Sequence, residues 1–389
     1  MGYKNKLYGK TRVRRNYARV LTDVKLPNLI KIQTESFQWL LDTGLKELFE
    51  ELSPITDHND GEKFELYFSE YEFDEPKYSI RESKIHSVNY SRALKVNVQL
   101  LNKETGEIKE DKIFMGDFPM MTPWGTFIIN GAERVVVTQI IRSAGVFFSK
   151  EINKKSGRAN FSGQVIPTRG AWIEFELGTK DIWYAKLDRS KKIPLSTFIR
   201  ALGVKSNKEI INLFGDSEFM QNTFAKDQSF GEDDAIRELY DKLRPGEKTG
   251  ADTARKFIAS RLFDVRRYDL ARVGRHKVNK KLDVVQRAIG NKLANDLVNK
   301  YTGEVIVPAG TEIDAKWAKV LEENREHFRI TKEYELMLEG NSVVLECLDV
   351  YVRGQENKQV VHLIGNDQRE ERLHVVLSDI FASISYYIN

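Results

Sequence analysis

Hydrophobic residues recur at spacings of three and four along residues 27–51, the period of an amphipathic helix. Pro27 suits the start of this helix, and Gly44 is a point at which it would break in two. Residues 64–73 alternate well enough for a strand, which Pro76 ends. The first part of the chain is therefore predicted to place a helix before a β-rich region.

Two hairpins are predicted next. Residues 94–100 alternate strictly between apolar and polar, and residues 108–114 return after a short turn, which indicates a half-buried hairpin. Asn130-Gly131 then joins a strand at 126–129 to a returning strand at 134–138. Both turn residues tolerate the positive φ that a tight hairpin turn requires.

Beyond Phe148 helices and strands mix. The pattern predicts strands at 172–177 and 182–187, helices at 195–202 and 234–263 (interrupted at Pro245-Gly246), and a helix opened by a capping box at Ser206-Asn-Lys-Glu209. An acidic, β-rich region is expected at about 303–372, and another apolar helix starts near Ile380. The expected class is α+β, with a β-rich domain that carries a helix, then a mixed α/β domain with a small β-rich subdomain.

Composition limits the number of domains and the cellular compartment. A chain of 389 residues favours two or three domains, and its 30% charged residues favour a wet, charged surface. No apolar run approaches the roughly 18 residues of a membrane span. The single cysteine, Cys347, excludes an intramolecular disulfide and a cysteine-based zinc site, and fits a reducing, cytoplasmic setting.

The net charge of +4 is small but unevenly distributed. Seven basic residues and no acidic residue lie between Tyr3 and Val20. The segment between Thr253 and Lys281 contains ten basic residues and only two acidic ones, Asp264 and Asp269. Either stripe alone is compatible with an ordinary solvated face. Two stripes, both interleaved with aromatic residues, favour a nucleic acid as the partner.

The sequence offers no catalytic constellation. It has neither a phosphate-binding loop nor a dinucleotide fingerprint, its six histidines are not paired at metal-ligand spacing, and it lacks the Asp-x-Asp-x-Asp magnesium cluster of a nucleotidyltransferase. No metal site is therefore predicted, and an independent hydrolase finds no support.

Binding candidates are stronger. Arg169 and Trp172 flank Gly170, where an arginine can contact phosphate and a tryptophan can stack on an unpaired base. Trp172 is equally compatible with a core residue at a strand edge. Asp188 lies beside Arg189 and Lys192, so it can accept from a base edge while its neighbours hold phosphates, or form a surface ion pair.

Two segments, Phe114–Gln139 and Arg142–Phe148, closely resemble the β subunit of bacterial RNA polymerase. Further matches follow in family order over nearly the whole chain, among them Arg169–Trp172, Leu243–Gly246 and Arg267–Arg275. The resemblance implies a DNA-facing piece of a multisubunit DNA-directed RNA polymerase, a nucleotidyltransferase, that has no catalytic centre of its own. A stand-alone nucleic-acid-binding adaptor is the alternative. A stop codon after codon 389 would favour the adaptor.

The resemblance also implies a domain organisation. Residues 1–141 would be the first half of the protrusion and residues 142–374 the lobe, with the small acidic subdomain at about 303–372. Residues 375–389 would begin a helix that continues in the longer family members, so the chain is expected to be a fragment. Together these domains would form one wall of the DNA cleft, near downstream duplex.

Residue roles are implied in the same way. Arg142, Trp172 and Asp188 match positions around the non-template strand, and Arg169, Arg189 and Lys192 are counted with them as nucleic-acid-binding. Val137 and Gln139 match the edge of the rifamycin region. Ile108, Lys109 and Glu110 match the edge segment that receives the transcription-repair coupling factor by strand pairing.

The implied partners are the other polymerase subunits (β′, α, ω and sigma), the template and non-template DNA strands, and the coupling factor, with no membrane. No cofactor is expected in this chain, since the Mg²⁺ of the full enzyme would be held by another subunit. The implied location is the cytoplasm, in association with the nucleoid.

Overall fold

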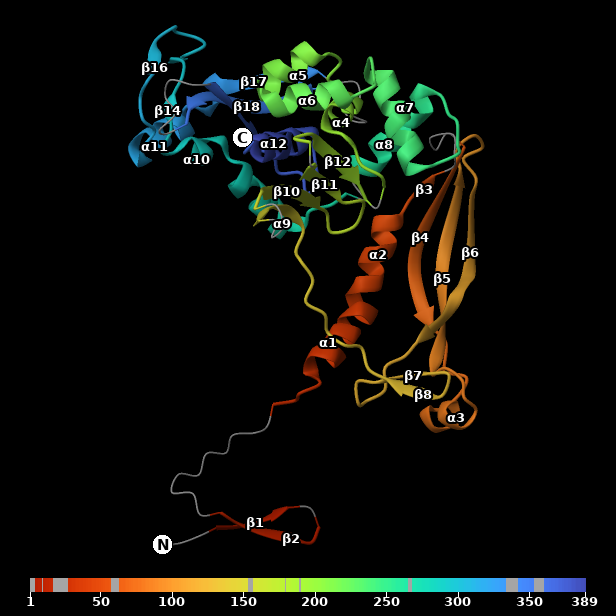
Figure 1. Ribbon diagram of the computed structural model, residues 1–389. Coiled ribbons are helices and arrows are strands. Elements are labelled where there is room, and N and C mark those ends of the chain that lie inside the picture. The colour runs from red at the N-terminus through yellow and green to blue at the C-terminus, as the bar shows by residue number, and fades with distance from the viewer. Residues whose placement is uncertain are drawn as a thin grey trace. The chain divides into compact units, whose positions relative to one another are not determined.

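The computed structural model describes residues 4–8, 10–16, 27–56, 63–152, 157–178, 180–188, 190–264, 268–333, 342–352 and 360–389. The chain divides into two compact units, Met1–Ile140 and Ile141–Asn389 (Figure 1). Every strand pair among the described residues is antiparallel, and helices accompany the sheets in both units. The predicted α+β class is confirmed.

The first unit begins with a hairpin, β1 (Lys4–Tyr8) and β2 (Arg12–Asn16). This hairpin carries much of the first basic stripe, and the side chains of Lys10, Arg12, Arg14 and Arg15 are exposed. Arg19, the last base of that stripe, lies outside the described residues.

The main sheet of this unit has four strands in the order β3-β4-β5-β6: β3 (Ile55–Thr56), β4 (Phe64–Phe73), β5 (Ser91–Asn102) and β6 (Ile108–Pro119). The predicted strand and the first hairpin are confirmed. Because side chains alternate along a strand, β5 buries Leu94, Val96 and Val98 on one face. β6 is an outer strand of the sheet and is largely exposed.

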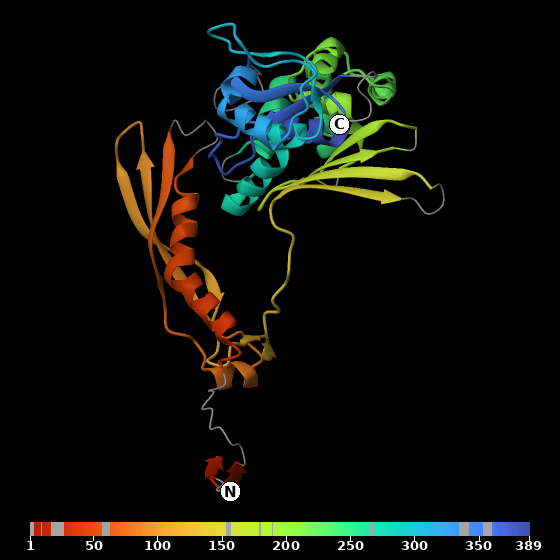
Figure 2. The ribbon, with the colours of Figure 1, turned by 90° about the vertical axis from the view of Figure 1, so that its left-hand side faces the viewer.

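One continuous helical stretch runs along the sheet, as α1 (Lys31–Trp39), the π-helical η1 (Leu40–Gly44) and α2 (Leu45–Leu52) (Figure 2). The predicted break at Gly44 is wrong, because the backbone widens there into a π-turn without leaving the helix. Phe49 packs its ring 5.5 Å from that of Phe68, and the Tyr71 hydroxyl donates to the Leu41 carbonyl. These contacts fix the helix on the sheet.

The second predicted hairpin is shorter than expected. After α3 (Ile80–Ile85), strands β7 (Phe127–Ile129) and β8 (Ala132–Arg134) flank Asn130 at φ 51° and Gly131 at φ 75°. A side chain on Gly131 would meet the Ser87 Cα at 2.7 Å, so only glycine fits. The strand predicted to continue to Thr138 ends at Arg134, because no described strand lies beside residues 135–138 to pair with them.

The second unit is built on a five-stranded sheet in the order β13-β12-β11-β10-β9. Its strands are β9 (Gly145–Ile152), β10 (Ala159–Ile166), β11 (Ile173–Leu177), β12 (Trp183–Leu187) and β13 (Ile193–Pro194). β11 and β12 confirm two predictions. The hairpin of β9 and β10 was not predicted, because its outer half is polar and exposed.

Helices that pack against this sheet or against one another build the largest core together with it. They are α4 (Leu195–Ala201), α5 (Asn207–Phe214), α6 (Glu218–Lys226), α7 (Glu232–Leu243), α8 (Ala251–Leu262), α9 (Ala271–Leu282) and α12 (Leu377–Ile388). The capping box predicted for α5 is only half formed. The Ser206 hydroxyl accepts from the Glu209 N–H, but the Glu209 carboxylate accepts from the Lys205 N–H.

A second, smaller core joins α10 (Val284–Ala288), α11 (Ala315–Glu323) and η2 (Arg325–Phe328) to a set of strands. The strands are β14 (Lys292–Leu293), β15 (Leu297–Val298), β16 (Val305–Val307), β18 (Ser342–Tyr351) and β19 (Val360–Asn366). β17 (Arg329–Glu333) pairs with β18 and contributes no residue to this core. Fully buried Glu346 pairs with both Arg325 and Arg329, at 2.6 and 2.9 Å. α11 is a helix inside the region predicted to be β-rich.

No helix in the part of the chain that the structure describes is long and apolar enough to cross a membrane.

Candidate nucleic-acid interface

Most of the residues predicted to bind nucleic acid lie at one end of the five-stranded sheet. In the register of the sheet, Gly145 at the start of β9 pairs with Ile166 at the end of β10, and Ile173 at the start of β11 pairs with Leu187 at the end of β12. β13 also begins at this end. The segments that carry Arg142, Arg169 and Trp172, Asp188, and Lys192 therefore emerge together. We call this region the loop end of the sheet.

Arg142 is exposed but held in place. Its guanidinium donates to Gln164 Oε1 at 2.8 Å and lies 5.0 Å from the centre of the Phe147 ring. Gln164 in turn donates to Glu174, which also accepts from Lys186. Phe147, Gln164, Glu174 and Lys186 are successive cross-strand neighbours on β9 to β12. A guanidinium has five N–H donors, so most of them are available for a ligand.

Trp172 and Asp188 are brought together by the backbone. The Asp188 N–H donates to the Trp172 carbonyl at 2.6 Å, and Asp188 adopts a positive φ of 57° at the end of β12. The Trp172 side chain is 42% exposed, whereas the preceding Ala171 is buried. This exposure favours a contact surface over the alternative of a core residue at a strand edge.

The neighbouring loop is fastened to the start of α9. The Thr168 N–H donates to the Asp269 carbonyl at 2.6 Å, and Arg169, the next residue, is exposed. Lys192 differs from the others, since its ammonium pairs with Glu176 and lies 5.7 Å from the centre of the Tyr184 ring. Arg189 lies outside the described residues.

The second basic stripe divides into structural and exposed residues. Arg255 pairs with Glu232, Asp233 and Asp252, and Arg275 is buried against Asp379. Arg266 and Arg267 lie outside the described residues. The bases of the stripe that stay exposed on α9, at spacings that place them along one side of the helix, are Arg272, Lys277 and Lys280. We call this side the basic face of α9.

The basic face of α9 adjoins Arg142. A side chain on Gly274 would meet the Ala144 Cβ at 3.1 Å, and the Lys277 ammonium donates to the Ser143 hydroxyl at 2.7 Å. None of these three exposed bases forms an ion pair with a carboxylate of the described residues. The helix therefore adds positive charge directly beside the loop end of the sheet.

Tyr268 is a residue of this region that sequence reasoning missed. Its side chain is fully buried, and its hydroxyl has no hydrogen-bond partner among the described residues. Burial raises the pKa of this hydroxyl, and the nearby Asp188 carboxylate raises it further. A neutral tyrosine thus lies beneath the Asp188 turn. No pattern in the sequence marked this position, because it depends on which loops the fold brings together.

Comparison with known proteins identifies the family. Residues 142–298 match the family model described as RNA polymerase Rpb2, domain 2. The whole chain is 46% identical to a DNA-directed RNA polymerase subunit beta of Acholeplasma laidlawii, of which it covers 36%. The same subunit of Listeria monocytogenes is 45% identical over 98% of this chain and 32% of the relative. The chain matches one part of the bacterial RNA polymerase β subunit.

The predicted recognition of the β-subunit family is therefore confirmed. The chain spans about a third of the length of the relatives it matches. The Rpb2 domain 2 match begins at residue 142, next to the start of the second compact unit at Ile141. The assignment of the two units as protrusion and lobe stays a prediction.

The three residues expected to receive the coupling factor lie on β6, an outer strand of its sheet. Ile108, Lys109 and Glu110 are all exposed, and Glu110 accepts from the Gln99 side-chain amide at 2.8 Å. β6 pairs only with β5 among the described strands, so its other edge has backbone groups that an incoming strand could bond. This geometry is compatible with strand pairing of the coupling factor to β6, which stays a prediction.

Val137 and Gln139 lie in the exposed segment that follows β8. Val137 is 76% exposed, and neither residue belongs to a helix or strand. Their place at the edge of the family's rifamycin region stays a prediction.

The described residues give little support to metal binding or to a cysteine nucleophile. Among the described residues no three His, Cys, Asp or Glu side chains come together as a metal site. Burial raises the pKa of the Cys347 thiol to about 12, so it stays protonated at neutral pH and is a poor nucleophile. The absence of a cofactor from this chain stays a prediction.

Proposed function

We propose that this chain forms one wall of the DNA cleft in a bacterial RNA polymerase, and that the loop end of its five-stranded sheet contacts the non-template strand. The observation that carries the proposal is the assembly of Arg142, Trp172 and Asp188 at one end of the sheet, beside the basic face of α9. The similarity to polymerase β subunits over the whole chain supports the same proposal.

Each residue type has a suitable role. An exposed indole provides a flat face on which an unpaired base stacks, worth about 1–3 kcal/mol. A carboxylate such as that of Asp188 accepts hydrogen bonds from a base edge, and Arg142 offers its remaining N–H donors to phosphate or base. The bases on α9 contact the backbone of the downstream duplex, which positions the DNA without reading its sequence.

Nucleotidyl transfer itself belongs to the complete enzyme. In that assembly the chain works with β′, α, ω and sigma, and holds DNA beside a catalytic centre whose Mg²⁺ another subunit supplies. The role of the described residues is to bind and orient the strand.

Phosphate contacts predict a strong salt dependence. The 389-residue chain is expected to bind fluorescein-labelled DNA weakly, with an affinity that falls steeply as salt rises. The double substitution Arg272→Gln/Lys280→Gln removes two exposed charges. It is expected to make the negative slope of log K against log salt shallower by about 2. Fluorescence anisotropy at four or more salt concentrations measures the slope.

A matched control is Lys316→Gln/Lys319→Gln, which removes two exposed charges from α11. It is expected to leave the slope unchanged. Binding that is insensitive to salt, or equal slopes for the two double variants, would contradict phosphate contact by α9.

We further propose that the outer edge of β6 receives the coupling factor by strand pairing. Glu110→Lys reverses a charge on an exposed strand and is expected to weaken coupling-factor binding by about tenfold, because a reversed charge disturbs the electrostatic complementarity of an interface. Surface plasmon resonance with the assembled polymerase measures the affinity, and basal transcription is expected to stay unchanged.

Glu47→Lys on α2 is the control, since it reverses an exposed charge of the same unit away from the β6 edge. Equal affinities of the Glu110→Lys and unsubstituted polymerases would reject the β6 contact.

A further inference from the structure

A buried tyrosine hydroxyl without a partner lies beneath the loop end of the five-stranded sheet. The Tyr268 side chain is fully buried, and its hydroxyl forms no hydrogen bond with any of the described residues. A buried polar group that forms no hydrogen bond lowers the stability of a fold. Phenylalanine would therefore fill the same space at a lower cost in stability, and the hydroxyl must serve another purpose.

The Tyr268 backbone is fixed on both sides. Its carbonyl accepts from the Val375 N–H at 3.0 Å, and its N–H donates to the Asp264 carbonyl at 2.9 Å. The carbonyl of the next residue, Asp269, accepts from the Thr168 N–H at 2.6 Å, which joins Tyr268 to the loop between β10 and β11. The ring cannot leave the loop end unless these backbone hydrogen bonds break.

The Asp188 carboxylate is a second group without a partner. Asp188 is exposed, and its carboxylate forms no ion pair or hydrogen bond with the residues that the structure describes. Its backbone is held, since its N–H donates to the Trp172 carbonyl and the Ser190 N–H donates to the Leu187 carbonyl. Rotation of the side chain is therefore the main way in which the carboxylate can change its position.

The two groups are close enough to interact. Burial raises the pKa of the Tyr268 hydroxyl, and the negative charge of Asp188 raises it further. The hydroxyl therefore keeps its proton at neutral pH and is available as a donor to a carboxylate. A buried donor and an exposed acceptor thus lie at the same end of the sheet.

An unpaired base at the loop end would change the surroundings of Asp188. A base that stacks on Trp172 excludes water from the carboxylate, while one carboxylate oxygen accepts from the edge of the base. The other oxygen then loses its water and requires a donor from the protein. The Tyr268 hydroxyl is a donor on the buried side of this carboxylate.

We infer that Tyr268 is a positioning residue of the nucleic-acid interface: its hydroxyl donates to one Asp188 oxygen when an unpaired base covers the loop end, and so directs the other oxygen at the base. This role rests on the proposed function and adds to it a residue that influences base preference without touching DNA. The ligand is an unpaired base whose edge carries an N–H donor. The cost of the unbonded hydroxyl in the free protein is then offset in the DNA-bound state.

The test measures promoter-complex lifetimes of the complete polymerase on promoters that carry each of the four bases in turn at each position of the melted non-template strand. The base preference is the ratio of the longest to the shortest lifetime at one position. Tyr268→Phe is expected to lower this ratio by about tenfold at a single position, the scale of one hydrogen bond to a charged group.

Asp188→Gly removes the carboxylate and tolerates the positive φ of 57° at this position. It is expected to lower the ratio at the same position. Adding Tyr268→Phe to Asp188→Gly is expected to have no further effect, because the two groups act as a pair.

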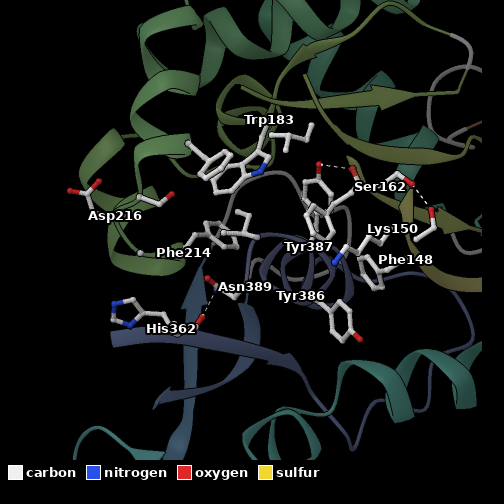
Figure 3. A pocket seen from close by; sticks show the side chains of 18 of the residues that line it. Phe148, Lys150, Ser162, Trp183, Phe214, Asp216, His362, Tyr386, Tyr387 and Asn389 are labelled. Atoms are coloured by element: carbon white, nitrogen blue, oxygen red, sulfur yellow. Dashed lines mark hydrogen bonds between the residues drawn. The ribbon is translucent and has the colours of Figure 1, made fainter. Parts of the chain in front are cut away.

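Tyr387→Phe is the matched control. Tyr387 is also a buried tyrosine of the second unit, but it lies on α12, and its hydroxyl donates to the Phe161 carbonyl (Figure 3). Phe161 pairs with Lys150 in the half of the β9–β10 hairpin that is remote from the loop end. Removal of this hydroxyl is expected to leave the base preference unchanged.

The outcomes distinguish the role of Tyr268 from the proposed function. An unchanged base preference in both Asp188→Gly and Trp172→Ala would overturn the proposed function and the role of Tyr268 with it. An unchanged preference in Tyr268→Phe, where Asp188→Gly lowers it, would overturn the role of Tyr268 alone. An equal loss of lifetime for all four bases, or an effect of Tyr268→Phe that persists beside Asp188→Gly, would also overturn it, since a purely structural tyrosine would give either result.

Discussion

Arg275→Ala is expected to destabilise the second unit by about 3–5 kcal/mol, the cost of leaving a buried charge without its partner. The Arg275 guanidinium donates to both oxygens of Asp379 at 2.8 Å and to the Arg372 carbonyl at 2.8 Å. Asp379 is 1% exposed, so water cannot replace the lost donors. Urea unfolding of the 389-residue chain, followed by circular dichroism, measures the change in free energy of unfolding.

The control lies three residues away on the same helix. Arg272 is exposed on the basic face of α9, and Arg272→Ala is expected to change stability by no more than about 0.5 kcal/mol. The double substitution Arg275→Met/Asp379→Leu is expected to recover only part of the loss. It removes both charges, but the Val376 N–H and the Asn366 amide, which also donate to Asp379, lose their acceptor. Similar losses for Arg275→Ala and Arg272→Ala would refute the distinction between structural and exposed bases.

Trp172→Ala, placed in the complete polymerase, is expected to shorten the lifetime of promoter complexes by roughly 5- to 150-fold, which corresponds to losing about 1–3 kcal/mol of base stacking. Arg142→Ala is expected to act in the same direction. Both side chains are exposed at the loop end of the sheet, so neither change opens the core. Lifetimes are measured by challenging preformed complexes with a competitor and following DNA release.

The phosphodiester chemistry is expected to stay within about twofold of the unsubstituted enzyme on a preassembled scaffold, because the proposed contact gives neither residue a part in nucleotidyl transfer. Tyr301→Ala provides the control, since Tyr301 is an 80% exposed aromatic residue of the same unit outside the loop end. Unchanged lifetimes in both the Trp172 and Arg142 variants would remove the support for a non-template contact.

Local signals in the sequence predicted much of the fold. The Asn130-Gly131 turn, the alternation in β5 and the helical spacing of α7 and α8 all depend on neighbours close in the chain, and all are confirmed. The predictions of strands were wrong where strand formation depends on a neighbouring strand with which to pair. Residues 135–138 have the composition of a strand, but no described strand lies beside them, and the polar half of β9 pairs with β10 despite its composition.

The candidate interface shows the same division. The resemblance supplied Arg142, Trp172 and Asp188 as separate positions, and only the register of the sheet brings them to one end. Counting bases between Thr253 and Lys281 could not separate Arg275 from Arg272, because the difference lies in Asp379, which is more than a hundred residues away. The series of hydrogen bonds from Arg142 to Gln164 and from Gln164 to Glu174 likewise depends on cross-strand neighbours.

The pairing of Arg275 with Asp379 also bears on how the chain is made. The two residues are 104 positions apart, so a ribosome that has produced α9 must add all the intervening residues before the partner exists. At about 5–20 residues per second that interval is roughly 5–20 s of synthesis. During it α9 lacks the anchor that turns Arg275 inward. The basic surface beside Arg142 therefore acquires its final form only after α12 has left the ribosome.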